Sequence, residues 1–200
     1  MNESTNSVNV AGKLKNLELS HKIYGEAFYT FFLECGRLSE KTDTLPITVS
    51  ERLLTKHLLC EGGEICVRGQ LRSYNKLVDG KVRLYLTIFA RDIEENKNSL
   101  NEIELTGYVC KPPIYRVTPF GREITDMLIA VNRAYNKSDY IPCIVWGRNA
   151  RYAAGFEVGD KIKLFGRVQS REYEKMLESG EKLQRIAYEV SIARLQKEQE

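Results

Sequence analysis

Histidine and tryptophan are scarce in this chain, whose 200 residues include two histidines and one tryptophan. The sequence also has no glycine-rich phosphate loop, no Gly-x-Ser-x-Gly turn and no paired metal-ligand spacing. Glu172 and Glu174 share one strand face, but two carboxylates alone do not make a catalytic site. We therefore expect a protein that is not an enzyme and carries no cofactor.

Long apolar runs and a dense set of cysteines are missing as well. No apolar run approaches the roughly 20 residues of a membrane helix, and the opening MNESTNSVNV lacks a basic-then-apolar leader pattern. The five cysteines are odd in number and scattered, unlike the even sets of small secreted scaffolds. His57, Cys60 and Cys66 are close in sequence, but a zinc site needs a fourth ligand and usually tighter spacing. These features predict a cytoplasmic protein with reduced thiols, no membrane contact and no metal.

An excess of one charge sign is absent overall, since the net charge is only +3. Basic residues nevertheless gather in one segment, where seven of them stand against three acidic residues between positions 111 and 151. A solvated charged surface is one explanation. Clustering of the same charges beside aromatic residues would indicate a nucleic-acid site instead.

The chain contains an internal repeat. Residues 25–52 align without gaps with residues 121–148, and seven of the 28 positions are identical. In the first copy these identities are Gly25, Arg37, Lys41, Asp43, Pro46, Val49 and Arg52. The polar stretch EENKNSLN (94–101) has the composition of a linker. We therefore predict an N-terminal domain over 1–95 and a C-terminal domain over 102–200.

Both copies show one order of expected elements. Three strands come first, at 8–14, after Gly25 and at 45–50 in the first copy, and at 103–110, after Gly121 and at 140–147 in the second. A short helix follows, then two strands joined by a hairpin near 79–80 or 179–180. Five strands with a helix between the third and fourth favour an OB-fold barrel. The predicted fold class is all-β, as two tandem five-stranded barrels, and a small α+β sandwich is the alternative.

The third strand of the second copy, within SDYIPCIVWGRNA (138–150), is apolar on both faces. The first copy indicates which face is buried, because Leu45, Ile47 and Val49 alternate there with polar residues and proline. The alignment then buries Ile141, Cys143 and Val145. It leaves three apolar residues on the face that is polar in the first copy, namely Tyr140, Ile144 and Trp146.

Two explanations fit these surplus aromatic residues. A sister subunit or the sibling domain could cover them, since exposed apolar patches often mark protein interfaces. Alternatively they stack on bases, because aromatic rings interleaved with Arg and Lys hold single strands without sequence readout. Tyr135, Trp146 and Tyr173 each lie two residues from a basic side chain, which favours the second explanation. The first copy has Ser39, Thr44 and Ser50 at the positions of Tyr135, Tyr140 and Trp146, so we expect it to be a degenerate domain that binds DNA weakly.

The second copy resembles the bacterial single-stranded DNA-binding protein family over its whole length. The similar segments are NEIELTGYVCKPPIYRVTPFGREITDMLIAVNR (101–133), DYIPCIVWGRNARYAA (139–154) and GDKIKLFGRVQSREYE (159–174). The resemblance implies sequence-tolerant single-strand binding in replication, recombination or repair. It implies base stacking by Tyr135, Tyr140, Trp146 and Tyr173. It also implies phosphate contacts from nearby basic residues, for which the candidates are Arg116, Arg122, Arg133, Lys137, Arg148 and Arg171.

The chain departs from the family pattern in two ways. It ends VSIARLQKEQE directly after the last expected strand, where the family usually has a disordered segment with an acidic tip, so recruitment of replication enzymes is in doubt. It also has two barrels where most members have one. Two such chains would supply the four barrels that the family commonly uses, so we expect a homodimer. The alternative function is an OB-fold adaptor of a primosome-like assembly, whose aromatic face binds protein.

Overall fold

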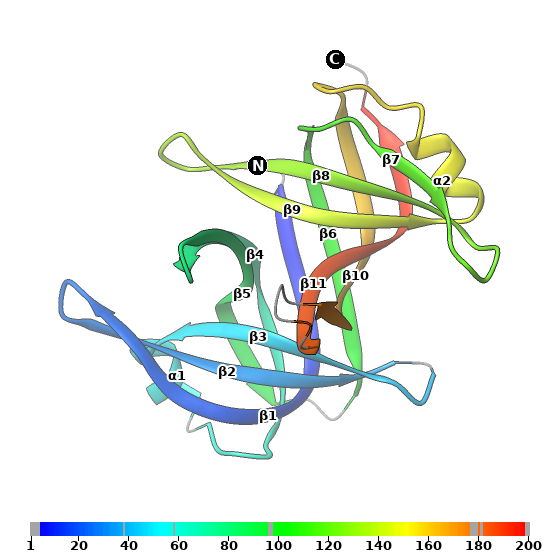
Figure 1. Cartoon of the computed structure of the whole chain (residues 1–200). Coiled ribbons are helices and arrows are strands. Elements are labelled where there is room, and N and C mark those ends of the chain that lie inside the picture. The colour runs from blue at the N-terminus through cyan, green and yellow to red at the C-terminus, as the bar shows by residue number, and fades with distance from the viewer. Residues whose placement is uncertain are drawn as a thin grey trace.

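The computed structural model describes residues 5–37, 39–57, 59–95, 98–176, 180 and 182–198. Strands dominate it and two short helices interrupt them (Figure 1). The first group of elements is β1 (Asn6–Ile23), β2 (Glu26–Gly36), β3 (Thr42–Ser50), α1 (Glu51–His57), β4 (Glu64–Val78) and β5 (Lys81–Glu95). The second group is β6 (Leu100–Val109), β7 (Ile114–Val117), β8 (Glu123–Arg133), β9 (Lys137–Trp146), α2 (Arg148–Ala153), β10 (Lys161–Met176) and β11 (Lys182–Lys197).

Each group closes into a five-stranded barrel. In the first group, β1 pairs with both β2 and β4, β2 with β3, β3 with β5 in parallel, and β5 with β4. In the second, β6 pairs with β8 and β10, β8 with β9, β9 with β11 in parallel, and β11 with β10. This connectivity, with a helix between the third and fourth barrel strands, confirms the predicted OB-fold. The α+β sandwich was the wrong alternative.

The burial pattern confirms the predicted core faces. Leu45, Ile47 and Val49 are fully buried, and Ile141, Cys143 and Val145 are buried at the matching places in β9. Ile144 has the outer parity but is only 4% exposed. Of the three apolar residues on the outer face of β9, only Tyr140 and Trp146 are therefore exposed.

Glycine allows the first strand of each barrel to bend past its neighbour. A Cβ atom on Gly12 of β1 would lie 2.1 Å from the carbonyl oxygen of Glu34 on β2. A Cβ atom on Gly107 of β6 would lie 2.6 Å from the carbonyl oxygen of Ala130 on β8. A strand that pairs with two neighbours in a small barrel must curve strongly, and a side chain at these points would separate the strands.

The two barrels lie next to each other and are joined through β1 and β6 (Figure 1). These strands pair antiparallel, with Asn6 opposite Leu105 and Ala11 opposite Leu100. The outcome is one sheet that runs through both barrels. The domain limits 1–95 and 102–200 stay a prediction, but the pairing shows that the two units are in direct contact.

Two buried aspartates form hydrogen bonds across this junction between the barrels. Asp43 accepts hydrogen bonds from Arg37 of its own barrel and from Arg167 and the Ser170 amide of the other. Asp139 accepts them from Arg133 of its own barrel and from Arg72 and the Ser73 amide of the other. Both carboxylates are 1% exposed. We call these two clusters the seam.

Three further features differ from the sequence expectations or extend them. The first strand is far longer than 8–14, because β1 continues to Ile23 in its pairing with β2. The short strand β7 on the edge of β8 was not predicted. Phe32 lies on the outer face of β2, between the buried residues Phe31 and Leu33, and is half-buried, with Pro46 and Lys15 as its strand partners.

Candidate nucleic-acid interface

Four aromatic side chains stand on the outside of the second barrel, as the sequence predicted. Tyr135 lies in the β8–β9 turn, where its φ of 63° is in the left-handed region. Its side chain is 93% exposed. Tyr140 and Trp146 on β9 are 45% and 37% exposed, and Tyr173 on β10 is 37% exposed. Large aromatic groups with this much accessible surface provide flat faces for a ligand from solution.

The indole of Trp146 is held in place by a polar contact. Its Nε1–H donates to the hydroxyl oxygen of Ser191 on β11 at 3.2 Å. The strand neighbour of Trp146 on β8 is Ile124, which is buried. A ring that is fixed at one edge and open to solvent elsewhere loses little freedom when another ring stacks on it.

Tyr173 carries a cation over its ring. The guanidinium carbon of Arg171 lies 5.7 Å from the ring centroid, a cation–π distance. The same guanidinium donates to the carboxylate of Glu189 at 3.4 Å, and Glu189 also accepts from Gln169 at 2.7 Å. Arg171 therefore connects a buried acidic group with an exposed aromatic face.

The six predicted phosphate contacts fall into two groups. Arg122, Lys137 and Arg148 are exposed and form no ion pair within the described part of the chain. The other three have carboxylate partners: Arg116 pairs with Asp126 at 2.7 Å, Arg171 with Glu189 at 3.4 Å and Arg133 with Asp139 at 3.3 Å. Only the first group has its full charge available to a phosphate without giving up a partner.

Sequence reasoning missed the seam next to this surface. The Tyr140 amide donates to the hydroxyl oxygen of Ser73, which belongs to the first barrel, at 2.7 Å. Arg72 reaches Asp139 from the same strand at 3.0 Å. The identical pairs Arg37/Asp43 and Arg133/Asp139 were the available signal, because a repeat keeps such a pair where both copies need it.

The first barrel also has exposed aromatic residues, of which the alignment indicated only Tyr74, near the place of Tyr173. Tyr74 on β4 is 50% exposed and stacks on Tyr85 of β5, with centroids 5.6 Å apart. Phe28 and Phe89 are half-buried and in contact with His21 and Arg91. The matched positions for Tyr135, Tyr140 and Trp146 are polar, yet aromatic rings lie on neighbouring strands.

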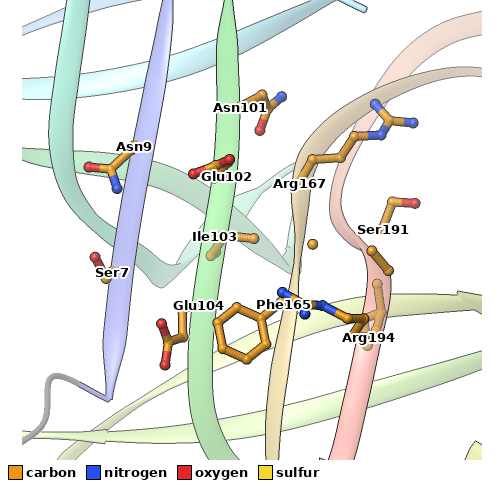
Figure 2. A pocket seen from close by; sticks show the side chains of 13 residues that line it. Ser7, Asn9, Asn101, Glu102, Ile103, Glu104, Phe165, Arg167, Ser191 and Arg194 are labelled. Atoms are coloured by element: carbon orange, nitrogen blue, oxygen red, sulfur yellow. The ribbon is translucent and has the colours of Figure 1, made fainter. Parts of the chain in front are cut away.

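A separate groove of about 620 Å³ runs along β1, β6, β10 and β11 (Figure 2). Figure 2 shows Arg194 beside the ring of Phe165, 5.0 Å from its centroid, and Lys163 approaches the same ring to 5.7 Å. The carboxylates of Glu102 and Glu104 also line the groove or its edge. These two carboxylates balance the charges of Arg167 and Arg194, so the groove has no excess positive charge to attract a phosphate backbone.

Among the residues that the structure describes, no three His, Cys, Asp or Glu side chains come together in a way that could hold a metal ion. The five cysteines are free thiols, and Cys35, Cys66 and Cys143 are buried. Among the helices that the structure describes, none is long and apolar enough to cross a membrane.

Comparison with known structures supports the arrangement of both barrels. The wild-type single-stranded DNA binding protein from Thermus aquaticus superposes with a TM-score of 0.80 over 98% of this chain and 93% of its own, at 20% identity. A deletion mutant of the same protein gives a TM-score of 0.76 at 22% identity. At this identity the likeness establishes the shared fold.

Sequence comparison finds relatives for part of the chain. Single-stranded DNA-binding protein 2 of Listeria innocua is 35% identical over 82 residues, which are 38% of this chain and 52% of that protein. Single-stranded DNA-binding protein A of Bacillus subtilis is 35% identical over 82 residues and is covered to 48%. The chain thus spans about half the length of the curated relatives it matches. Residues 100–197 match the model of the single-strand binding protein family, so the second barrel is a domain of that family.

Proposed function

We propose that this chain binds single-stranded DNA with little sequence preference, in replication, recombination or repair. One observation carries the proposal. Four exposed aromatic side chains share the outside of one barrel with three cations that form no ion pair among the residues the structure describes. Stacking on Tyr135, Tyr140, Trp146 and Tyr173 is tolerant of sequence, because every base has a π face. The family model matches this same half of the chain, and the relatives that the chain matches are named single-stranded DNA-binding proteins.

The ion pairs support different roles for the six predicted cations. Arg122, Lys137 and Arg148 contact phosphates directly, since no carboxylate neutralises them within the described residues. Arg116 and Arg171 join them when a phosphate replaces their half-exposed or buried carboxylate partners. Arg133 belongs mainly to the seam, because Asp139 is buried and needs its counter-charge.

Substitution of the tryptophan tests the stacking role. Trp146→Ala should weaken binding of a dye-labelled oligo-dT by about 1–3 kcal/mol, as measured by fluorescence anisotropy. Tyr152→Ala is the control, since Tyr152 is 52% exposed but lies on α2 against Phe156. Equal affinities for Trp146→Ala and the wild type would contradict stacking. A wild-type chain that does not bind oligo-dT at low salt would favour the protein-binding adaptor.

We also propose that the chain forms a homodimer. The outer face of the continuous sheet through β1, β6 and β10 supports this, because Phe165 lies there between Lys163 and Arg194 and opposite Glu104. A face with both signs of charge around an aromatic ring suits a two-fold interface, in which each patch meets its own copy. Light scattering at micromolar concentration should give twice the chain mass of 23.0 kDa. A mass of one chain would exclude the dimer.

A further inference from the structure

The first barrel has an aromatic strip of its own, made by His21, Phe28, Phe89 and Arg91. The ring of Phe28 on β2 stacks on His21 of β1, with centroids 5.3 Å apart and planes within 13°. Phe89 on β5 lies 6.1 Å from Phe28. The Arg91 guanidinium lies 5.5 Å above the Phe89 ring. His21 and Arg91 are exposed and the two phenylalanines are half-buried, so the strip is open to solvent.

The strip occupies the place where the second barrel has Trp146. Thr48 in the first copy aligns with Ile144 in the second. Thr48 is paired with Phe89 and Ile144 is paired with Ser191, so Phe89 occupies the position of Ser191. Phe28 is opposite Ser50 in the β2–β3 pair, just as Ile124 is opposite Trp146 in the β8–β9 pair. The first barrel has therefore lost the aromatic residue on the central strand and gained one on each flanking strand.

The strip leads to the seam and from there to the second barrel. Arg91 donates to the side-chain oxygen of Gln70 at 3.3 Å, and Arg72 donates to the same oxygen. Arg72 continues to Asp139, and its neighbour Ser73 accepts from the Tyr140 amide. Tyr140 is one of the four proposed stacking residues, so a continuous chain of hydrogen-bonded side chains connects the strip with the proposed DNA surface.

Charge favours a nucleic-acid ligand at the strip. Arg91 is exposed and forms no ion pair within the described part of the chain. Next to it, Arg72 and Arg133 both pair with the carboxylate of Asp139, so two positive charges face one negative charge. A basic side chain beside stacked aromatic rings is the combination that holds a single strand, with the bases on the rings and the phosphates near the cations.

We propose that the first barrel binds single-stranded DNA through His21, Phe28, Phe89 and Arg91, and that one strand runs from Tyr140 across the seam onto this strip. The inference rests on the proposed function of the second barrel. It replaces the expectation of a first barrel that contributes little, which was based on the polar residues at Ser39, Thr44 and Ser50. The first barrel would then use a different set of residues for the same ligand.

The test uses the full chain and exchanges strip residues for their counterparts in the second barrel. The variant Phe28→Ile/Phe89→Ser copies Ile124 and Ser191, so it keeps side chains that an OB barrel already accommodates at these places. Arg91→Ala removes the strip's cation. Arg68→Ala is the matched control, because Arg68 is an exposed arginine of the β4–β5 pair whose charge is already paired with Glu94 at 2.7 Å.

Binding is measured with a short oligo-dT of about 8 nucleotides, which one barrel can hold, and a long one of about 30, which can span both. The strip variants should lose roughly 5- to 150-fold in affinity for the long strand and keep their affinity for the short one. The Arg68→Ala control should change neither. Circular dichroism melting of each variant identifies any that are misfolded. Arg91→Ala, which shortens an exposed side chain, provides the result if the double variant misfolds.

Unchanged affinity of folded strip variants for the long strand would overturn the inference and leave the proposed function intact. A change in mass by light scattering without a change in DNA affinity would assign the strip to contact with a second copy instead, and would also overturn it. If the wild-type chain binds neither oligonucleotide, the proposed function itself fails.

Discussion

Neutralising Asp139 should loosen the junction between the barrels. The carboxylate is 1% exposed, and it accepts from Arg72 at 3.0 Å, from Arg133 at 3.3 Å and from the Ser73 amide at 2.8 Å. Asp139→Asn keeps an oxygen for Ser73 but leaves two arginine charges without a counter-charge. Removing one partner of a buried ion pair costs about 3–5 kcal/mol.

The expected effect is smaller here because the arginines are partly solvated. Their side chains are 18% and 32% exposed, so water screens part of the lost interaction and about 2 kcal/mol remains. With a urea slope of about 2 kcal/mol per molar, the midpoint of unfolding should fall by about 1 M. Circular dichroism in urea measures this directly.

A surface ion pair provides the control. Asp126 pairs with Arg116 at 2.7 Å, but the two side chains are 38% and 51% exposed. Asp126→Asn should therefore cost no more than about 1 kcal/mol. If Asp139→Asn lowers the midpoint no more than Asp126→Asn does, the seam does not stabilise the chain as described.

Two other predictions follow from the charges and thiols. Arg148→Gln should reduce the slope of log binding constant against log salt concentration for oligo-dT by about 0.7, since a phosphate contact is lost. Arg133→Gln should leave this slope nearly unchanged, and equal reductions would contradict the division of the cations into two groups. Burial raises the pKa of Cys35 to about 12, whereas Cys60 is exposed. A thiol reagent at pH 8 should therefore label Cys60 in the folded protein and Cys35 only after unfolding. Equal labelling rates would show that the core of the first barrel is accessible to the reagent.

The sequence was sufficient for the barrels because local patterns encode them. Alternation in β3 identified the buried face, and the repeat transferred that result to Ile141, Cys143 and Val145 in β9, where both faces are apolar. Ile144 was harder, because parity alone cannot tell an open outer face from a covered one. Its 4% exposure depends on the three-dimensional surroundings of the strand.

The seam could not be derived from local patterns. Asp139 meets Arg72 across 67 residues of chain and Asp43 meets Arg167 across 124, and no periodicity links such positions. The identity of Asp43 with Asp139 was visible in the repeat, but its reason is a contact between barrels that only the fold shows. The same limit hid the strip, since Phe89 aligns with a serine and touches Phe28 from a distant strand.

The most direct test of single-strand binding by the second barrel is the fluorescence of Trp146 during titration with oligo-dT at low salt. The chain has one tryptophan, so the signal has one source, and its indole is 37% exposed on the proposed surface. Stacking on a base should quench the emission in a saturable way, and added salt should reverse the quenching. Emission that stays unchanged while the oligonucleotide is shown to be bound by anisotropy would contradict the placement of DNA on this face.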